Sequence, residues 1–176
     1  AQTYADEIVV RDSHTGKVKT RAQGPVGGVG HAISDDGHRL LSCTKGKLHL
    51  YLLDGQAAPL KVLLPPEHPI AVRFSTDGTM VAVVGFFDNI RLFEVGTRRA
   101  IGQFGPTPEG VRDVAFSPDD SLMAAAGRDG RVSIWDVATA TLKNVHKLND
   151  QRACSVEWLD ASTLVALGCD GRLIRW

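Results

Sequence analysis

Residues 114–136 have the sequence VAFSPDDSLMAAAGRDGRVSIWD, and this stretch decides the fold. The turn-forming pair Asp119-Asp120 separates two short apolar runs, and Asp129-Gly130 separates the second run from an alternating segment that ends at Trp135. Such pairs between short apolar runs favour tight β-hairpins. The sequence around this stretch therefore predicts four consecutive antiparallel strands, at 112–116, 122–126, 131–135 and 141–147.

The pattern recurs along the chain with a nearly constant period. The turn motif that begins at Ser117 also begins at Ser34 and Ser75, and a degenerate copy begins at Leu159, so the steps are 41, 42 and 42 residues. A second anchor ends the third strand of each unit, and it is aromatic every time: Tyr51, Phe93, Trp135 and Trp176. Two anchors that keep one period indicate an internal structural repeat.

One such unit cannot cover both of its own faces. Its second strand is apolar throughout, at 80–84, 122–126 and 164–167, and a strand of this kind must be packed on both sides. Radial stacking of successive units covers both faces and leaves only short edges. We therefore expect an all-β fold, a β-propeller segment of about four blades with four antiparallel strands each. It forms a single domain over 1–176, with blade portions at about 5–23, 28–64, 69–104, 110–148 and 152–176.

The segments 114–120 and 126–136, including the dipeptide Trp135-Asp136, resemble a WD40 repeat, and the resemblance extends over nearly the whole chain from about Glu7. It implies a buried hydrogen-bond network of a His, a turn Asp, a strand hydroxyl and the Trp. The expected His positions hold Pro66, Thr107 and Asn149, so we expect an incomplete network and blades held mainly by apolar packing. The structural positions that the resemblance implies are Trp135, Asp136, Asp129, Asp170, Trp176, Phe93 and Tyr51.

The strand count leaves the ring of blades open. Two strands at 7–11 and 17–20 precede the first full unit, and the last unit contains only three strands, whereas WD40 rings usually contain more blades. An open arc exposes apolar sheet faces at its ends, which favours association. We expect the chain to be part of a larger or assembled ring, completed by further sequence, a second chain or a second copy.

Composition and motifs exclude several classes of function. Lys plus Arg and Asp plus Glu number 20 each, and a formal net charge of zero gives no electrostatic reason to expect nucleic acid or a membrane surface as the partner. No catalytic or metal-binding motif is present, so we expect a non-enzyme without a cofactor or metal. Cys43, Cys154 and Cys169 have no metal spacing and are odd in number, so we expect free thiols and a cytoplasmic location, with a periplasmic or secreted mature chain as the alternative.

The resemblance also implies where a partner would bind. In WD40 propellers, the loops that join the second and third strands and the loops between blades gather on one face around the channel. The candidate partner-binding residues on that face are Thr44, Phe86, Phe87, Arg128 and Cys169, with Glu109, Arg112 and Arg152 at the blade connections. Aromatic and arginine side chains are typical interface anchors.

These observations favour a non-catalytic scaffold that docks protein or peptide partners on a propeller face, within a larger multidomain or multichain assembly. Two alternatives stay open. The chain could be the propeller part of an enzymatic or redox complex whose cofactor is bound elsewhere, or it could be the regulatory sensor domain of a signalling enzyme.

Overall fold

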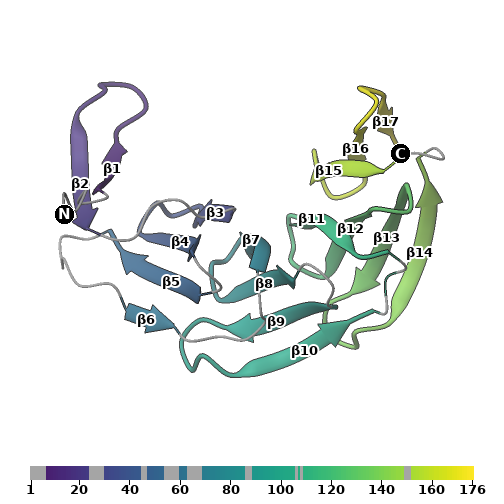
Figure 1. The fold of residues 1–176 in the computed structure, drawn as a ribbon, viewed down its shortest axis with the longest axis horizontal. Coiled ribbons are helices and arrows are strands. Elements are labelled where there is room, and N and C mark those ends of the chain that lie inside the picture. The colour runs from purple at the N-terminus through teal and green to yellow at the C-terminus, as the bar shows by residue number, and fades with distance from the viewer. Residues whose placement is uncertain are drawn as a thin grey trace, which may run out of the picture.

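The computed structural model describes residues 7–23, 30–44, 47–53, 60–62, 69–85, 89–105, 107, 109–148 and 152–176. Within these ranges the chain consists of strands and turns, with no helix. Successive antiparallel sheets fan out side by side into an arc (Figure 1). This confirms the all-β fold of four-stranded propeller blades, and the arc is a partial propeller because its sheets do not close.

Three sheets have four strands, and each strand pairs with the next one in sequence. The first blade contains β3 (Gly30–Ile33), β4 (Arg39–Thr44), β5 (Lys47–Leu52) and β6 (Leu60–Val62). The second contains β7 (Pro69–Phe74), β8 (Met80–Gly85), β9 (Ile90–Glu94) and β10 (Ala100–Phe104). The third contains β11 (Val111–Phe116), β12 (Leu122–Gly127), β13 (Arg131–Asp136) and β14 (Leu142–Lys147). These last four are the strands expected from the deciding stretch.

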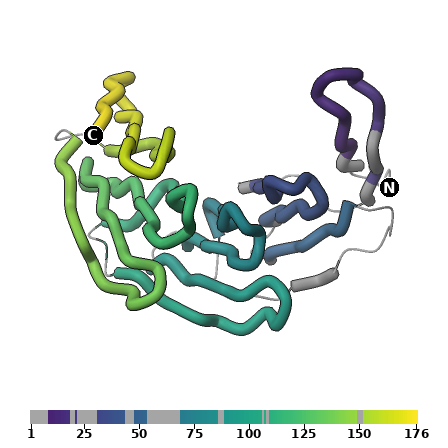
Figure 2. The backbone as a smooth tube through the Cα atoms, turned by 180° about the vertical axis from the view of Figure 1, so that it is seen from behind, coloured from purple at the N-terminus to yellow at the C-terminus, as the bar shows by residue number. Residues whose placement is uncertain are grey.

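Two shorter sheets lie at the ends of the arc. The hairpin of β1 (Glu7–Arg11) and β2 (Val18–Gln23) precedes the first blade. The fourth blade has the three strands β15 (Ala153–Trp158), β16 (Leu164–Gly168) and β17 (Leu173–Arg175). The innermost strands β3, β7, β11 and β15 follow the concave side of the arc, and β6, β10 and β14 follow the convex side (Figures 1 and 2).

The core of the molecule lies between blades rather than within them. One apolar cluster joins the first and second blades through Leu41, Leu50, Val83 and Phe93. A second cluster joins the second and third blades, and a third joins the third and fourth. The fully apolar second strands explain this arrangement, because β8 and β12 contribute buried side chains to the clusters on both of their sides.

The aromatic anchor of each unit packs against the preceding sheet. Trp135 belongs to the cluster between the second and third blades, where its ring meets the edge of Phe104 at a centroid distance of 6.1 Å. Phe93 and Trp176 occupy the equivalent places at the neighbouring interfaces, and Tyr51 packs with Val10 of the terminal hairpin. The 42-residue period therefore places one large ring in every interface.

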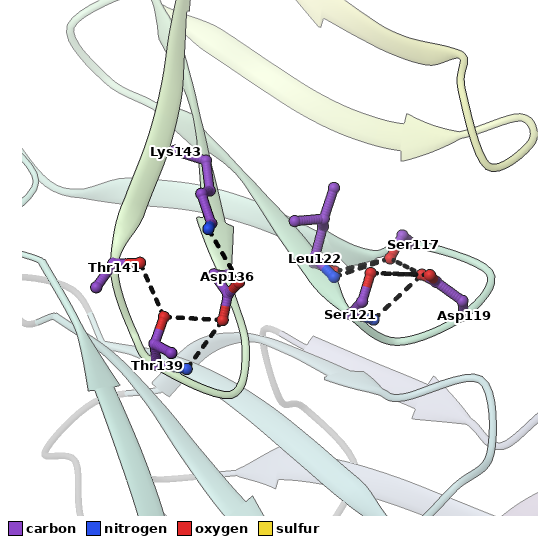
Figure 3. A network of polar contacts seen from close by, with 8 residues as sticks. All are labelled: Ser117, Asp119, Ser121, Leu122, Asp136, Thr139, Thr141 and Lys143. Atoms are coloured by element: carbon purple, nitrogen blue, oxygen red, sulfur yellow. Dashed lines mark hydrogen bonds and ion pairs between the residues drawn. The ribbon is translucent and has the colours of Figure 1, made fainter.

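The turns after the innermost strands are held by a repeated pair of residues. In the third blade the Ser117 hydroxyl donates to Asp119 at 2.6 Å, and Asp119 also accepts from the Ser121 amide at 3.2 Å (Figure 3). These hydrogen bonds lower the pKa of the Asp119 carboxyl, and the bond from the Ser117 hydroxyl contributes most. Asp120 has a different role, because its carboxylate accepts from the backbone amides of Thr76 and Asp77, at 2.7 and 3.0 Å. It thus fastens the third blade to the second.

The cysteine expectation is wrong for two of the three residues. Cys154 and Cys169 form a disulfide with a Cα–Cα distance of 5.2 Å, while Cys43 is a free, buried thiol whose pKa burial raises to about 12. The pairing arises because β15 and β16 are antiparallel neighbours, and the Cys169 amide donates to the carbonyl of Arg152 at 2.9 Å. An odd cysteine count leaves one thiol over but does not prevent the other two from meeting.

Candidate functional site

The predicted partner-binding face is only partly described. Phe86 and Phe87 lie outside the described residues, and Thr44 is described only as the last residue of β4. The Arg128 amide donates to the Gly110 carbonyl at 3.0 Å, so its loop lies against the connection that carries Glu109 and against the start of β11, which carries Arg112. The Cys169 amide makes the equivalent bond to the Arg152 carbonyl. The structure therefore brings five predicted residues to the same end of the blades, where the innermost strands start.

On that face, Glu109, Arg112, Arg152 and Cys169 are exposed, and Arg128 is half-buried. Glu109 adopts a positive φ of 61°, which places it at a sharp turn before Gly110. The two turn aspartates in the same loops accept hydrogen bonds from backbone amides of their own loops. Asp129 and Asp170 each accept a backbone amide two residues further on, from Arg131 and Arg172, at 3.1 Å.

The remaining structural positions show that the hydrogen-bond network implied by the resemblance is not formed at the third blade. Trp135 is buried, and its indole Nε1 has no hydrogen-bond partner among the described residues. Asp136 instead holds the turn between β13 and β14, accepting from the Thr139 amide at 2.9 Å and pairing with Lys143 at 3.3 Å (Figure 3). Apolar contact, rather than a polar network, fixes Trp135.

A second candidate site, absent from the sequence prediction, lies at the opposite end of the innermost strands. It is a hollow of about 350 Å³ on which all four blades converge. Its lining comprises His31, Ala32, Ile33 and Asp35 of the first blade, Arg73, Phe74 and Thr76 of the second, Ala115 and Phe116 of the third, and Glu157 of the fourth. The hollow lies beside the serine–aspartate turns, whereas Arg128 and Arg112 lie at the strand starts.

One repeat position from every blade lines this hollow. Ala32, Arg73 and Ala115 each stand two residues before the turn serine of their blade, and Glu157 stands two residues before the degenerate turn at Leu159. Two of the four side chains are methyl groups and two are long and oppositely charged. The two alanines are too small to fill the hollow, and Arg73 and Glu157 place charged groups in it.

A buried polar junction supports the wall of the hollow and ties three blades together. The Asp113 carboxylate pairs with Arg73 Nη2 at 2.9 Å and accepts from the Ser155 hydroxyl at 2.7 Å. The Asp113 side chain is 9% exposed and that of Arg73 is 37% exposed. Asp113 therefore has protein partners on both sides, as a buried carboxylate requires.

Glu157 differs from Asp113 because no guanidinium or ammonium group in the described ranges lies within ion-pair distance of it. Partial removal of water raises the pKa of its carboxyl. Arg73 opposes this shift, and the carboxylates of Asp113 and Asp35 add to it. The hollow therefore contains a carboxylate whose negative charge the protein itself does not fully compensate.

Sequence reasoning missed Arg73, Asp113 and Glu157, although the repeat contains a usable signal. Positions 71, 113 and 155 are equivalent and hold Ala, Asp and Ser, while positions 73, 115 and 157 hold Arg, Ala and Glu. Charged residues at innermost-strand positions that are small in neighbouring blades mark side chains that face the axis. A comparison of equivalent positions between the repeats would have selected these residues.

The described ranges contain no group of three or more His, Cys, Asp or Glu side chains placed to hold a metal ion. They also contain no helix with the length and apolarity needed to cross a bilayer.

Comparison with known proteins gives one consistent result. The family model described as WD domain, G-beta repeat matches residues 99–136. WD repeat-containing protein 1-B of Xenopus laevis is 27% identical over 139 residues, which are 74% of this chain and 22% of that protein. Actin-interacting protein 1 of Caenorhabditis elegans is 23% identical over the same shares of the two chains. WD repeat-containing protein 90 of Xenopus tropicalis is 28% identical over 71% of this chain and 7% of its own length.

This chain therefore spans about a fifth of the length of the first relatives that it matches. The match at 99–136 covers the last strand of the second blade and the first three strands of the third, and the relatives extend the likeness over about three quarters of the chain. Residues 99–136 match a WD40 repeat, and the stacked four-stranded blades with their recurring aromatic anchors make the chain similar to WD40-repeat β-propeller proteins.

Proposed function

We propose that this chain is a non-catalytic scaffold that docks a protein or peptide partner on its propeller surface. WD-repeat proteins are in general protein-interaction scaffolds, and this supports the class of function. The observation that carries the proposal is the stacking of blades through buried apolar interfaces, which holds residues from different blades at fixed positions. A surface that is already rigid loses little conformational entropy when a partner binds.

The names of two relatives support a protein as the partner. The proteins from Caenorhabditis elegans and Drosophila melanogaster are called actin-interacting protein 1, and they are 23% and 27% identical to this chain. We infer from them the chemical class of the partner and not its identity. The balanced charge of the chain gives no independent support for nucleic acid.

Affinity capture from the native source, followed by mass spectrometry, tests the docking function and the predicted face together. We expect the double variant Arg112→Ala and Arg152→Ala to lose at least about tenfold of the captured partner, because two exposed arginines are removed from one interface. Arg99→Ala, an exposed arginine at the β9–β10 turn, is the control and should leave capture unchanged.

Three results would count against this interpretation. Capture that the double variant does not reduce would place the docking face elsewhere. The absence of any specific partner would remove the scaffold function. A stoichiometric cofactor in the absorption spectrum or metal analysis of the purified chain would favour the alternative of an enzymatic or redox complex.

We also propose that the open face of the fourth blade packs against a further sheet, supplied in solution by a second copy of the chain. Leu167 and Leu173, 40% and 66% exposed, are the repeat equivalents of Ala126 and Val132, which are fully buried against the fourth blade. The third blade covers this face with a neighbouring sheet, and the equivalent face of the fourth blade is apolar enough to need the same cover. Exposed apolar side chains of this size on a sheet face favour association.

Mass photometry of the purified chain tests this assembly. We expect a dimer or larger species, and we expect the double variant Leu167→Lys and Leu173→Lys to shift the population toward the monomer, because each lysine places a charge in the interface. Val145→Lys, on the outer strand β14 and 40% exposed, should change nothing. A wild-type chain that is monodisperse and monomeric would rule the assembly out.

A further inference from the structure

Two carboxylates remain uncompensated in the hollow between the four blades. Asp35, Asp113 and Glu157 carry three negative charges in and beside it, against the single positive charge of Arg73. Arg73 is already bound to Asp113 at 2.9 Å. Within the described residues neither Glu157 nor Asp35 has a cation at ion-pair distance. A ligand that fits this charge must be positive.

The size and walls of the hollow narrow the ligand further. A volume of about 350 Å³ is near the lower end of the range of about 300–1,000 Å³ for small-molecule sites, so it suits one long side chain better than a larger compound. Phe74, half-buried, contributes an aromatic surface to the lining. A planar guanidinium can stack on an aromatic ring and still direct its N–H groups to carboxylates, which an ammonium group does less well.

We propose that this hollow receives an arginine side chain of a protein partner, with Glu157 and Asp35 as its acidic contacts and Phe74 as its stacking surface. The proposal rests on the docking function proposed above. It specifies which side chain of the partner binds at the hollow, at the opposite end of the innermost strands from Arg112. Partial loss of water around Glu157 strengthens its attraction for an incoming cation, because charges interact more strongly where water is excluded. Ala32 and Ala115 keep the space open, and the Arg73–Asp113 pair holds the wall in place.

The probe is a pentapeptide, acetyl-Ala-Ala-Arg-Ala-Ala-amide, titrated into the full chain and followed by NMR and calorimetry. Two further peptides carry citrulline, which has the shape of arginine without its charge, or lysine at the centre. We expect the arginine peptide to shift the resonances of Arg73, Ala115 and Glu157, and to bind at least about tenfold more tightly than either other peptide.

Glu157→Gln keeps the size of the side chain and removes its charge, and it should weaken binding of the arginine peptide at least about fivefold. Glu94→Gln is the matched control, since Glu94 is exposed at the end of β9 and does not line the hollow. It should leave binding within a factor of two, and circular dichroism confirms that both variants fold.

Equal binding of the arginine and citrulline peptides, no binding of either, or full affinity in Glu157→Gln would overturn the proposal. Equal binding of the lysine peptide would overturn the choice of arginine. If these tests fail while capture still depends on Arg112 and Arg152, the docking function stands and only this second site falls. If capture fails as well, both fall.

Discussion

Replacing Trp135 by alanine is expected to lower the free energy of unfolding by about 3–5 kcal/mol, the usual cost of removing a buried tryptophan. Trp135 is 7% exposed in the apolar cluster between the second and third blades and contacts the Phe104 ring. Neither blade can close over the cavity without losing contacts with its other neighbour. Urea unfolding, followed by circular dichroism, measures the change in free energy.

Trp135→Phe and Leu142→Ala are the companion variants for this measurement. Trp135→Phe should cost less than the alanine variant, because the indole Nε1 has no hydrogen bond to lose among the described residues. Leu142→Ala removes a half-exposed side chain from β14 and should change the free energy of unfolding by less than about 1 kcal/mol. A loss below about 1 kcal/mol for Trp135→Ala would show that this interface does not hold the blades together.

The second large effect is expected at the polar junction. Arg73→Met should lower the free energy of unfolding by about 2–3 kcal/mol, because among the described residues it leaves the buried Asp113 carboxylate with only the Ser155 hydroxyl and the Val156 amide as donors. Breaking a fully buried pair costs about 3–5 kcal/mol. We expect less here because the Arg73 side chain is 37% exposed, so water in the hollow can partly solvate Asp113.

A double variant separates the loss of the pair from the loss of packing. Arg73→Met combined with Asp113→Asn removes the unpaired charge and should recover at least about half of the loss. Arg99→Met, an exposed arginine outside the junction, should stay within about 0.5 kcal/mol of the wild type. If the double variant is no more stable than Arg73→Met, the Arg73–Asp113 charge pair does not fasten the blades.

The sequence predicted the strands well because their determinants are local. Asp119-Asp120 and Asp129-Gly130 force turns at fixed places, and the period of the anchors carries the pattern from one blade to the next. The strands expected in the third blade match β11–β14 to within one residue at each end. The open arc of blades was also predictable, because the strand count alone leaves the ring incomplete.

The sites depend on distances across blades, which local patterns do not contain. Arg73 and Asp113 are 40 positions apart, and nothing in either segment specifies that their side chains point to the same junction. The Cys154–Cys169 pair likewise depends on the register of β15 and β16. The cytoplasmic location was expected because all three cysteines were expected to be free thiols. Only Cys43 is free among them, and the location stays a prediction. The partner-binding role of Arg128 and its neighbours stays a prediction.

In the described part of the chain, each of the three large apolar clusters joins two neighbouring blades, so cooperativity is expected to be short-ranged. Openings of the structure should therefore propagate inward from the ends instead of involving the whole chain at once. At one end, the β1–β2 hairpin joins the first blade through the small cluster of Val10 with Leu40, Tyr51 and Leu53. Amide protons in β1 and β2 should exchange with solvent sooner than those of β8 and β12, which are covered on both sides.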